Sequence, residues 1–263
     1  MDSIKRKEGW LKMIEIKNVS KSYRSKHVVN SVTTDIPEGK ITCIIGPNGA
    51  GKSTLLNMIS RLTPLDSGEI KIDGKAIGDW DKAELAKTIA TLKQENSTNV
   101  RLTVYELISF GRFPHSGGRL NDEDKRVIEE AIEYMNLGEF RDKYLDELSG
   151  GQRQRAYIAM TIAQNTKYIL LDEPLNNLDM KSSVAMMKIL DKLVKDFNKT
   201  IVIVMHDINF TSVYSDYILA MKNGKLKHMD KTQNVVVKET LEKLYEMPFH
   251  IQEINNKNIC VYF

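Results

Sequence analysis

The chain has 263 residues, which is enough for one large or two small domains with a substantial core, and its content of 41% hydrophobic and 28% charged residues is ordinary for a globular protein. Its formal net charge of +3 is too small to indicate nucleic-acid binding without a concentrated basic patch, so no nucleic-acid partner is expected. The sequence has no run of about 18 apolar residues that could span a membrane, and its N-terminus lacks the apolar core of a signal peptide, so we expect a protein of the cytosol.

The first part of the chain alternates between strand and helix patterns. Residues 1–12 are predicted to be a flexible extension, and residues 13–19 alternate apolar and polar positions as a half-buried strand does. The apolar run 41–45 stops at a glycine and predicts a buried parallel strand. Leucines and isoleucines share one face of a predicted helix over 53–62, and glycines bound a further strand over 69–72.

The middle of the chain predicts only helices, over about 96–165. Asn121 is placed to cap a helix that opens with three carboxylates, has one apolar face and ends at Gly138. A second helix is expected to start at Gly150 or Gly151 and to run to about Ala163. This region is therefore predicted to be a helical insertion within an α/β fold.

Strand and helix alternate again after the insertion. Residues 168–171 and 201–205 are apolar runs typical of buried strands, and residues 184–194 form an amphipathic helix whose methionines are expected to fill the core. A hairpin is predicted over 217–229, turning at Asn223-Gly224.

A phosphate-binding loop connects the predicted strand 41–45 to the helix that follows it, which is the context such a loop requires. Its glycines let backbone N–H groups point at a β-phosphate. Lys52 would place a positive charge at the β- and γ-oxygens, and the Ser53 hydroxyl would reach a magnesium ion. The predicted nucleotide-binding residues of the loop are Gly46, Pro47, Asn48, Gly49, Ala50, Gly51, Lys52, Ser53 and Thr54.

Two adjacent carboxylates end the apolar strand 168–171. The carboxyl ends of strands in open α/β sheets are where ligands bind. Asp172 is predicted to hold magnesium, directly or through water, and Glu173 to act as the general base on the attacking water.

Three further side chains are weaker candidates by themselves. His206 follows the strand 201–205 at the same end of the sheet, where it would contact the γ-phosphate, although a lone histidine is more often structural. Gln94 ends a short predicted strand over 89–93 and could reach both the metal and the water, although glutamine is common there. Tyr23 could stack on adenine, a role that another aromatic side chain could fill.

The segment Ser149-Gly150-Gly151-Gln152 opens a helix and is a second phosphate-binding device. One chain rarely needs two such devices for one nucleotide. The surplus indicates a protein that pairs with a copy of itself to complete its site.

These elements together resemble the nucleotide-binding subunit of an ATP-binding-cassette (ABC) transporter, from about Met13 to about Met229. The resemblance implies an α/β fold of the P-loop NTPase ABC type, with a mixed sheet, an N-terminal antiparallel β subdomain and an inserted α-helical subdomain. Residues 13–263 would form a single nucleotide-binding domain. The features that carry the resemblance occur in one order: the phosphate loop, Gln94, Leu148 to Gln152, Asp172-Glu173, Leu178-Asp179 and His206.

In such cassettes two subunits lie head to tail and enclose two ATP molecules with Mg²⁺. The resemblance implies that Tyr23 stacks on adenine and that Gln94 binds the metal and faces the membrane partner. Residues Ser149 to Gln152 would close over the γ-phosphate held by the opposite subunit, and Asp179 would lie at the dimer seam. No separate C-terminal regulatory domain is expected after residue 229.

A cassette without a membrane span resembles the separate ATPase subunit of a bacterial importer. Gly111 to His115, with the sequence Gly-Arg-Phe-Pro-His, resembles the ATPases of iron–siderophore, haem and cobalamin uptake, and residues 174–180 resemble the iron–siderophore members most. The implied partners are a membrane permease, docked around Gln94 to Arg112 at the cytoplasmic face of the membrane, and indirectly an external substrate-binding protein. Haem, cobalamin or another metal remains an alternative cargo, and a soluble cassette for DNA repair or translation is a more distant alternative.

Overall fold

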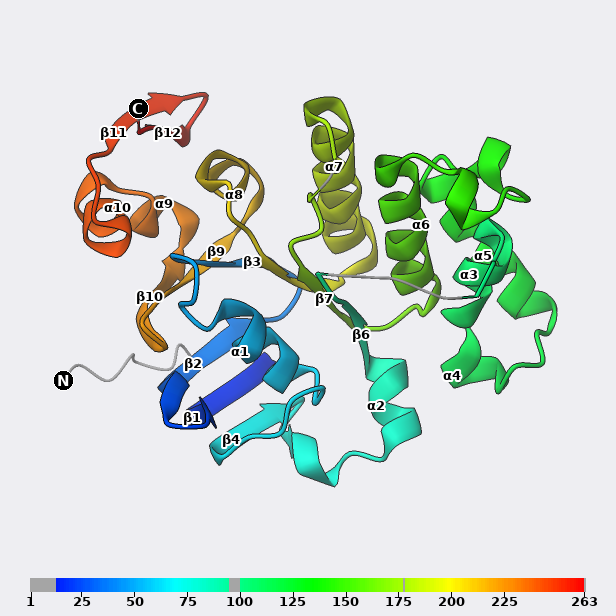
Figure 1. The fold of residues 1–263 in the computed structure, drawn as a ribbon, viewed down its shortest axis with the longest axis horizontal. Coiled ribbons are helices and arrows are strands. Elements are labelled where there is room, and N and C mark those ends of the chain that lie inside the picture. The colour runs from blue at the N-terminus through cyan, green and yellow to red at the C-terminus, as the bar shows by residue number, and fades with distance from the viewer. Residues whose placement is uncertain (1–12, 95–99, 177, 263) are drawn as a thin grey trace.

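The structure is a computed structural model that describes residues 13–94, 100–176 and 178–262 (Figure 1). Within these ranges the largest sheet has six strands in the order β10-β9-β3-β8-β7-β6. Its strands from β9 to β6 are parallel, and β10 is antiparallel at the edge. The strands are β3 (Ile41–Ile45), β6 (Ile89–Leu92), β7 (Tyr168–Asp172), β8 (Thr200–Val204), β9 (Tyr217–Lys222) and β10 (Lys225–Lys231).

A second, antiparallel sheet is built by the N-terminal part of the chain, in the order β2-β1-β4-β5. Helix α1 (Lys52–Ile59) packs between the two sheets, because its buried leucines and isoleucine share one hydrophobic cluster with strands of both (Figure 1). The strands of this sheet are β1 (Met13–Tyr23), β2 (Lys26–Pro37), β4 (Ser67–Ile72) and β5 (Lys75–Ala76).

The six-stranded sheet separates two hydrophobic cores. Successive side chains of a strand point to opposite faces, so in β3 Cys43 belongs to one core and Ile44 to the other. The same alternation divides β7 and β8. One core lies against α1 and the antiparallel sheet, and the other lies against the remaining large helices. Both faces of the parallel strands are therefore covered, as their continuous apolar sequences predicted.

Helices fill the described part of the segment between β6 and β7, and they gather beyond the β6 edge of the sheet (Figure 1). The fold class predicted from the sequence, a mixed sheet with an antiparallel N-terminal sheet and inserted helices, is confirmed. The inserted helices are α3 (Val104–Phe110), α4 (Phe113–Ser116), α5 (Asp122–Tyr134) and α6 (Gly150–Ala163). The other helices are α2 (Lys82–Thr88), α7 (Met180–Phe197), α8 (Ile208–Tyr214), α9 (Thr232–Val235) and α10 (Lys238–Tyr245).

Two predicted helix ends are wrong by a few residues. The helix expected over 53–62 ends at Ile59, because Arg61 adopts a left-handed conformation with φ 60°. The helix capped by Asn121 ends at Tyr134 rather than at Gly138, because Asn136 takes the left-handed position with φ 51°. Glycine is the usual residue at this position, and asparagine also takes it.

The end of the chain carries structure that the sequence did not predict. Strands β11 (His250–Ile254) and β12 (Lys257–Val261) form a hairpin that packs on α8. Asn209 of α8 receives the Cys260 N–H at 2.7 Å and donates to the Cys260 carbonyl at 3.1 Å. The predicted flexible extension over residues 1–12 lies outside the described residues.

Candidate functional site

The phosphate loop runs from the end of β3 to the start of α1. The Lys52 ammonium donates to the carbonyls of Gly46 at 2.8 Å and Pro47 at 3.1 Å. Burial lowers the pKa of Lys52, and the negative charges of Glu173 and Asp172 oppose that shift. Among the described residues no side chain caps the first amides of α1, which leaves them directed at the loop. A helix start of this kind favours an anion.

Glycine is required where the loop touches neighbouring backbone. Gly46 has φ 145°, and a Cβ there would lie 2.0 Å from the Met221 carbonyl oxygen. Gly51 has φ 95°, and a Cβ there would lie 2.3 Å from the Val28 carbonyl oxygen. The tight approach of β2 and β9 thus fixes the path of the loop.

Replacing Gly46 with alanine is expected to lower the free energy of unfolding by about 1–3 kcal/mol and to weaken nucleotide binding, because the backbone must move away from Met221. Urea denaturation and titration with a fluorescent ATP analogue measure the two effects. Gly78→Ala is the matched control, since a Cβ at Gly78 meets no atom within 4 Å. Equal unfolding midpoints for Gly46→Ala and the unmodified protein would contradict the steric argument.

The two predicted carboxylates lie at the end of β7, beside the loop. The Ser53 hydroxyl donates to Asp172 Oδ1 at 2.9 Å. Burial raises the pKa of Asp172, and the bond from Ser53 opposes this rise. Glu173 is 9% exposed and has φ 50°, with its N–H bonded to the Val204 carbonyl at 3.2 Å. Such strain is retained where the surrounding structure fixes it, often at functional sites.

The Glu173 carboxylate is the centre of a polar cluster. Its Oε2 accepts hydrogen bonds from Gln94 Nε2 and from Asn176 Nδ2, each at 2.7 Å. Its Oε1 lies 2.5 Å from His206 Nε2. The structure therefore brings Gln94 and His206 to Glu173, although 79 and 33 residues separate them from it along the chain.

A pocket of about 610 Å³ lies over the phosphate loop and this cluster. Val28 and Asn176 line it and were not predicted; the sequence signal for Asn176 is its position three residues after Glu173. The predicted residues in the lining are Asn48, Gly49, Ala50, Gly51, Lys52, Ser53, Thr54, Gln94, Glu173 and His206.

Other predicted site residues lie away from this pocket. Tyr23 is 51% exposed at the end of β1, with Lys21 Nζ 5.7 Å from its ring centre. Ser149 and Gln152 form a capping box at the exposed start of α6, next to Gly150 and Gly151. Asp179 caps α7 by accepting the Ser182 N–H at 2.7 Å, and this bond lowers the pKa of Asp179.

Residues Ser149 to Gln152 are the signature segment, and α6, which they open, is the signature helix. This helix also contacts the loop that follows Glu173. Gln154 donates to the Pro174 carbonyl at 3.1 Å. A Cβ at Gly151 would lie 3.4 Å from Leu178. Gln154, for which the sequence predicts no role, thus links the first turns of α6 to the segment that follows Glu173.

One correction concerns Arg112, predicted to lie in the surface that meets a permease. Its side chain is only 5% exposed and is bonded inside the helical region. The neighbouring Phe110 and Phe113 are the exposed side chains, at 55% and 60%. Arg112 is buried because its guanidinium satisfies buried carboxylate and carbonyl groups that water cannot reach.

Comparison with known proteins identifies this arrangement. A family model described as ABC transporter matches residues 29–176. The chain belongs to the ABC transporter family. It is 57% identical over 251 residues to the petrobactin import ATP-binding protein YclP of Bacillus subtilis, covering 95% of this chain and 100% of the relative.

This ABC chain is also similar to other ABC proteins. The iron(3+)-hydroxamate import ATP-binding protein FhuC of Bacillus subtilis is 39% identical, over 91% of this chain and 90% of the relative. A bacterial ABC transporter cassette solved as a dimer matches with a TM-score of 0.76 and 34% identity, over 84% of this chain and 99% of that one. The same cassette was solved in a post-hydrolysis state with ADP and Pi. The predicted ATP-hydrolysing ABC subunit is confirmed. In the part of the chain that the structure describes, no helix is long and apolar enough to cross a membrane.

Proposed function

We propose that this ABC chain is the ATP-hydrolysing subunit of an importer of iron–siderophore complexes, acting as a head-to-tail dimer on a separate membrane permease. The observation that carries the hydrolytic role is the buried Glu173 carboxylate beside the phosphate loop, held by Gln94, Asn176 and His206. The cargo is inferred from relatives named for petrobactin and iron(3+)-hydroxamate import.

Residues 13–263 would act as one nucleotide-binding domain in which the pocket over the loop takes the phosphates of ATP. Lys52 and the loop amides bind them, His206 contacts the γ-phosphate, and Tyr23 stacks on adenine. Glu173 accepts a proton from the attacking water. Its partners orient the carboxylate so that it does not have to reorganise during the reaction.

The donors beside the loop fit a magnesium ion. The Ser53 hydroxyl lies 2.9 Å from the Asp172 carboxylate. The Gln94 side chain reaches the adjacent residue, Glu173, to which it donates a hydrogen bond. These are the oxygen ligands that Mg²⁺ prefers, and Mg²⁺ commonly takes only one or two carboxylates together with phosphate oxygens. When bound, the ion would neutralise charge on the β- and γ-phosphates.

The exposed start of α6, with Ser149 to Gln152, would serve the ATP held by the second copy, with Asp179 at the seam. Four features favour this: the helix start is exposed, it lies outside its own pocket, its amides suit an anion, and a related cassette is a dimer.

The permease would dock at the cytoplasmic face of the membrane on the surface between Gln94 and the α3–α4 turn, where Phe110 and Phe113 are exposed. An external binding protein would deliver the cargo to the permease and would not touch this subunit.

Deleting the gene should abolish uptake of at least one ferric siderophore, with petrobactin and hydroxamate complexes tested first and haem and cobalamin beside them. Reintroducing the gene restores uptake, whereas a Lys52→Ala copy does not, because phosphate binding is lost. If siderophore uptake stays normal and haem or cobalamin uptake is lost, the proposed siderophore cargo is wrong and haem or cobalamin is the cargo.

A further inference from the structure

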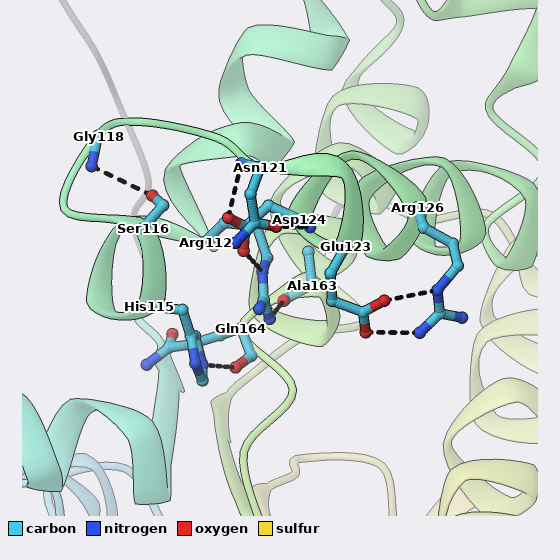
Figure 2. Close-up of polar contacts among 10 residues, drawn as sticks. All are labelled: Arg112, His115, Ser116, Gly118, Asn121, Glu123, Asp124, Arg126, Ala163 and Gln164. Carbon is cyan, nitrogen blue, oxygen red and sulfur yellow. Dashed lines mark hydrogen bonds and ion pairs between the residues drawn. The ribbon is translucent and has the colours of Figure 1, made fainter.

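The turn between α3 and α4 has two faces of different character. Phe110 and Phe113 are exposed, whereas Arg112 and His115 turn toward the carboxyl end of α6 (Figure 2). The turn also fits closely against α6, because a Cβ at Gly111 would lie 2.2 Å from the Met160 carbonyl oxygen. This turn therefore joins an exposed aromatic surface to the end of the signature helix.

Arg112 ties the carboxyl end of α6 to the start of α5. Its Nε donates to Asp124 Oδ1 at 2.9 Å, and its Nη1 donates to the Ala163 carbonyl at 2.9 Å (Figure 2). Asp124 is 1% exposed and also exchanges capping hydrogen bonds with Asn121. Burial acts to raise the pKa of Asp124, but the bonds from Asn121 and Arg112 outweigh it and leave the pKa lowered, so the pair is ionic.

His115 makes the second bond to this end of α6. Its Nε2 lies 2.9 Å from the Gln164 carbonyl oxygen, and since a carbonyl only accepts, Nε2 must carry the hydrogen (Figure 2). The Gln164 side chain in turn donates to the carbonyls of Ala86 and Ile89, at 2.5 and 3.1 Å. The end of α6 is thus fixed to the α3–α4 turn and to the α2–β6 junction.

Because α6 is one continuous helix, contacts at its carboxyl end also affect the position of its start. The helix has 14 residues, which corresponds to about 21 Å at 1.5 Å per residue. Carbonyls at a helix end carry partial negative charge and favour a cationic partner such as Arg112. Because the far end of the helix is Ser149, a small change of angle at Ala163 displaces the signature.

We propose that Arg112 and His115 are positioning residues that set the orientation of the signature helix from its carboxyl end. This inference rests on the proposed function, in which Ser149 closes over ATP held by a second copy. Arg112 and His115 touch no nucleotide; they act through α6. A purely structural role would alter stability alone, whereas a positioning role alters ATP-dependent dimerisation in a folded protein.

The test uses a Glu173→Gln background, in which ATP with magnesium is expected to hold the dimer. His115→Ala is the main variant, because His115 is exposed and its loss leaves no buried charge. We expect it to raise the ATP concentration at half-dimerisation about three- to tenfold, the equivalent of one lost hydrogen bond. Binding of a fluorescent ATP analogue to the monomer stays unchanged, and amide hydrogen exchange over 150–163 becomes faster.

Three companion variants sharpen the result. His115→Gln keeps a donor of similar reach and should restore dimerisation. Arg112→Gln combined with Asp124→Asn replaces the ion pair with a neutral one, avoids an unpaired buried charge, and should raise the half-dimerisation concentration at least as much as His115→Ala. His228→Ala, on the exposed face of β10, is the matched control and should behave as the background does.

The outcomes separate the two proposals. If the Glu173→Gln protein stays monomeric with ATP and magnesium, the shared site fails and the positioning role fails with it. If that protein dimerises and His115→Ala dimerises at the same ATP concentration with unchanged exchange over 150–163, only the positioning role is overturned.

Discussion

Replacing Glu173 with glutamine is expected to slow ATP hydrolysis by about 10²–10⁴-fold, the usual contribution of a general base. The fold should survive, because the glutamine oxygen can still accept the hydrogen bonds from Gln94 and Asn176. What is lost is the charge that takes a proton from water. ATP binding should be retained, so the protein should accumulate as an ATP-bound dimer.

Phosphate release measures the loss of hydrolysis, and gel filtration with ATP and magnesium measures the dimer. Glu69→Gln on β4 is the matched control, since Glu69 is a partly exposed residue of the N-terminal antiparallel sheet. Retained hydrolysis in Glu173→Gln would assign the base to another residue. A monomer in the presence of ATP would count against the shared site.

Replacing Ser149 with arginine is expected to abolish most ATP hydrolysis while the isolated subunit still binds ATP. The long side chain would occupy the exposed start of α6, where the partner's γ-phosphate should lie. Loss of the cap costs about 1 kcal/mol and does not unfold a protein of this size. Asp81→Arg is the matched control, because Asp81 is the exposed cap of α2, in a different helix.

A mixing experiment shows whether the two copies share sites. A Lys52→Ala subunit has a defective phosphate loop and an intact signature, and a Ser149→Arg subunit has the reverse. A head-to-tail dimer of one of each contains one site in which both halves are intact. We expect the mixture to capture more ATP than either variant does alone. No capture in the mixture, with each variant folded, would contradict the shared site.

Local sequence was sufficient for most of the pocket and for the strands and helices that carry it, but not for the C-terminal hairpin of β11 and β12. The phosphate loop could be predicted as a unit, because its glycines and Lys52 act within one turn between a strand and a helix. The apolar run before Asp172 likewise predicted a carboxylate at the end of a buried strand. Helix ends near Arg61 and Asn136 were missed, because each helix is followed by a non-glycine residue in the left-handed conformation, which is uncommon and has no strong local signal.

The contacts of Arg112 could not be predicted from the sequence. Phe110 and Phe113, close to Arg112 in sequence, are exposed. Nothing local indicates that the Arg112 guanidinium lies between Asp124 and Ala163. Gln154 was missed for the same reason, because its bond to the Pro174 carbonyl depends on how α6 packs. Asn176 lies only three residues after Glu173, but its bond to the carboxylate depends on the backbone turn that follows Glu173.

The sequence alone determined that this chain is an ABC cassette with a phosphate loop, a signature and a carboxylate pair, because each motif is a short segment whose chemistry follows from adjacent residues. Only the tertiary structure decided which distant side chains hold Glu173 and what fixes the signature helix. Those contacts join residues tens of positions apart, and burial makes each of them depend on the whole packed arrangement rather than on any local pattern.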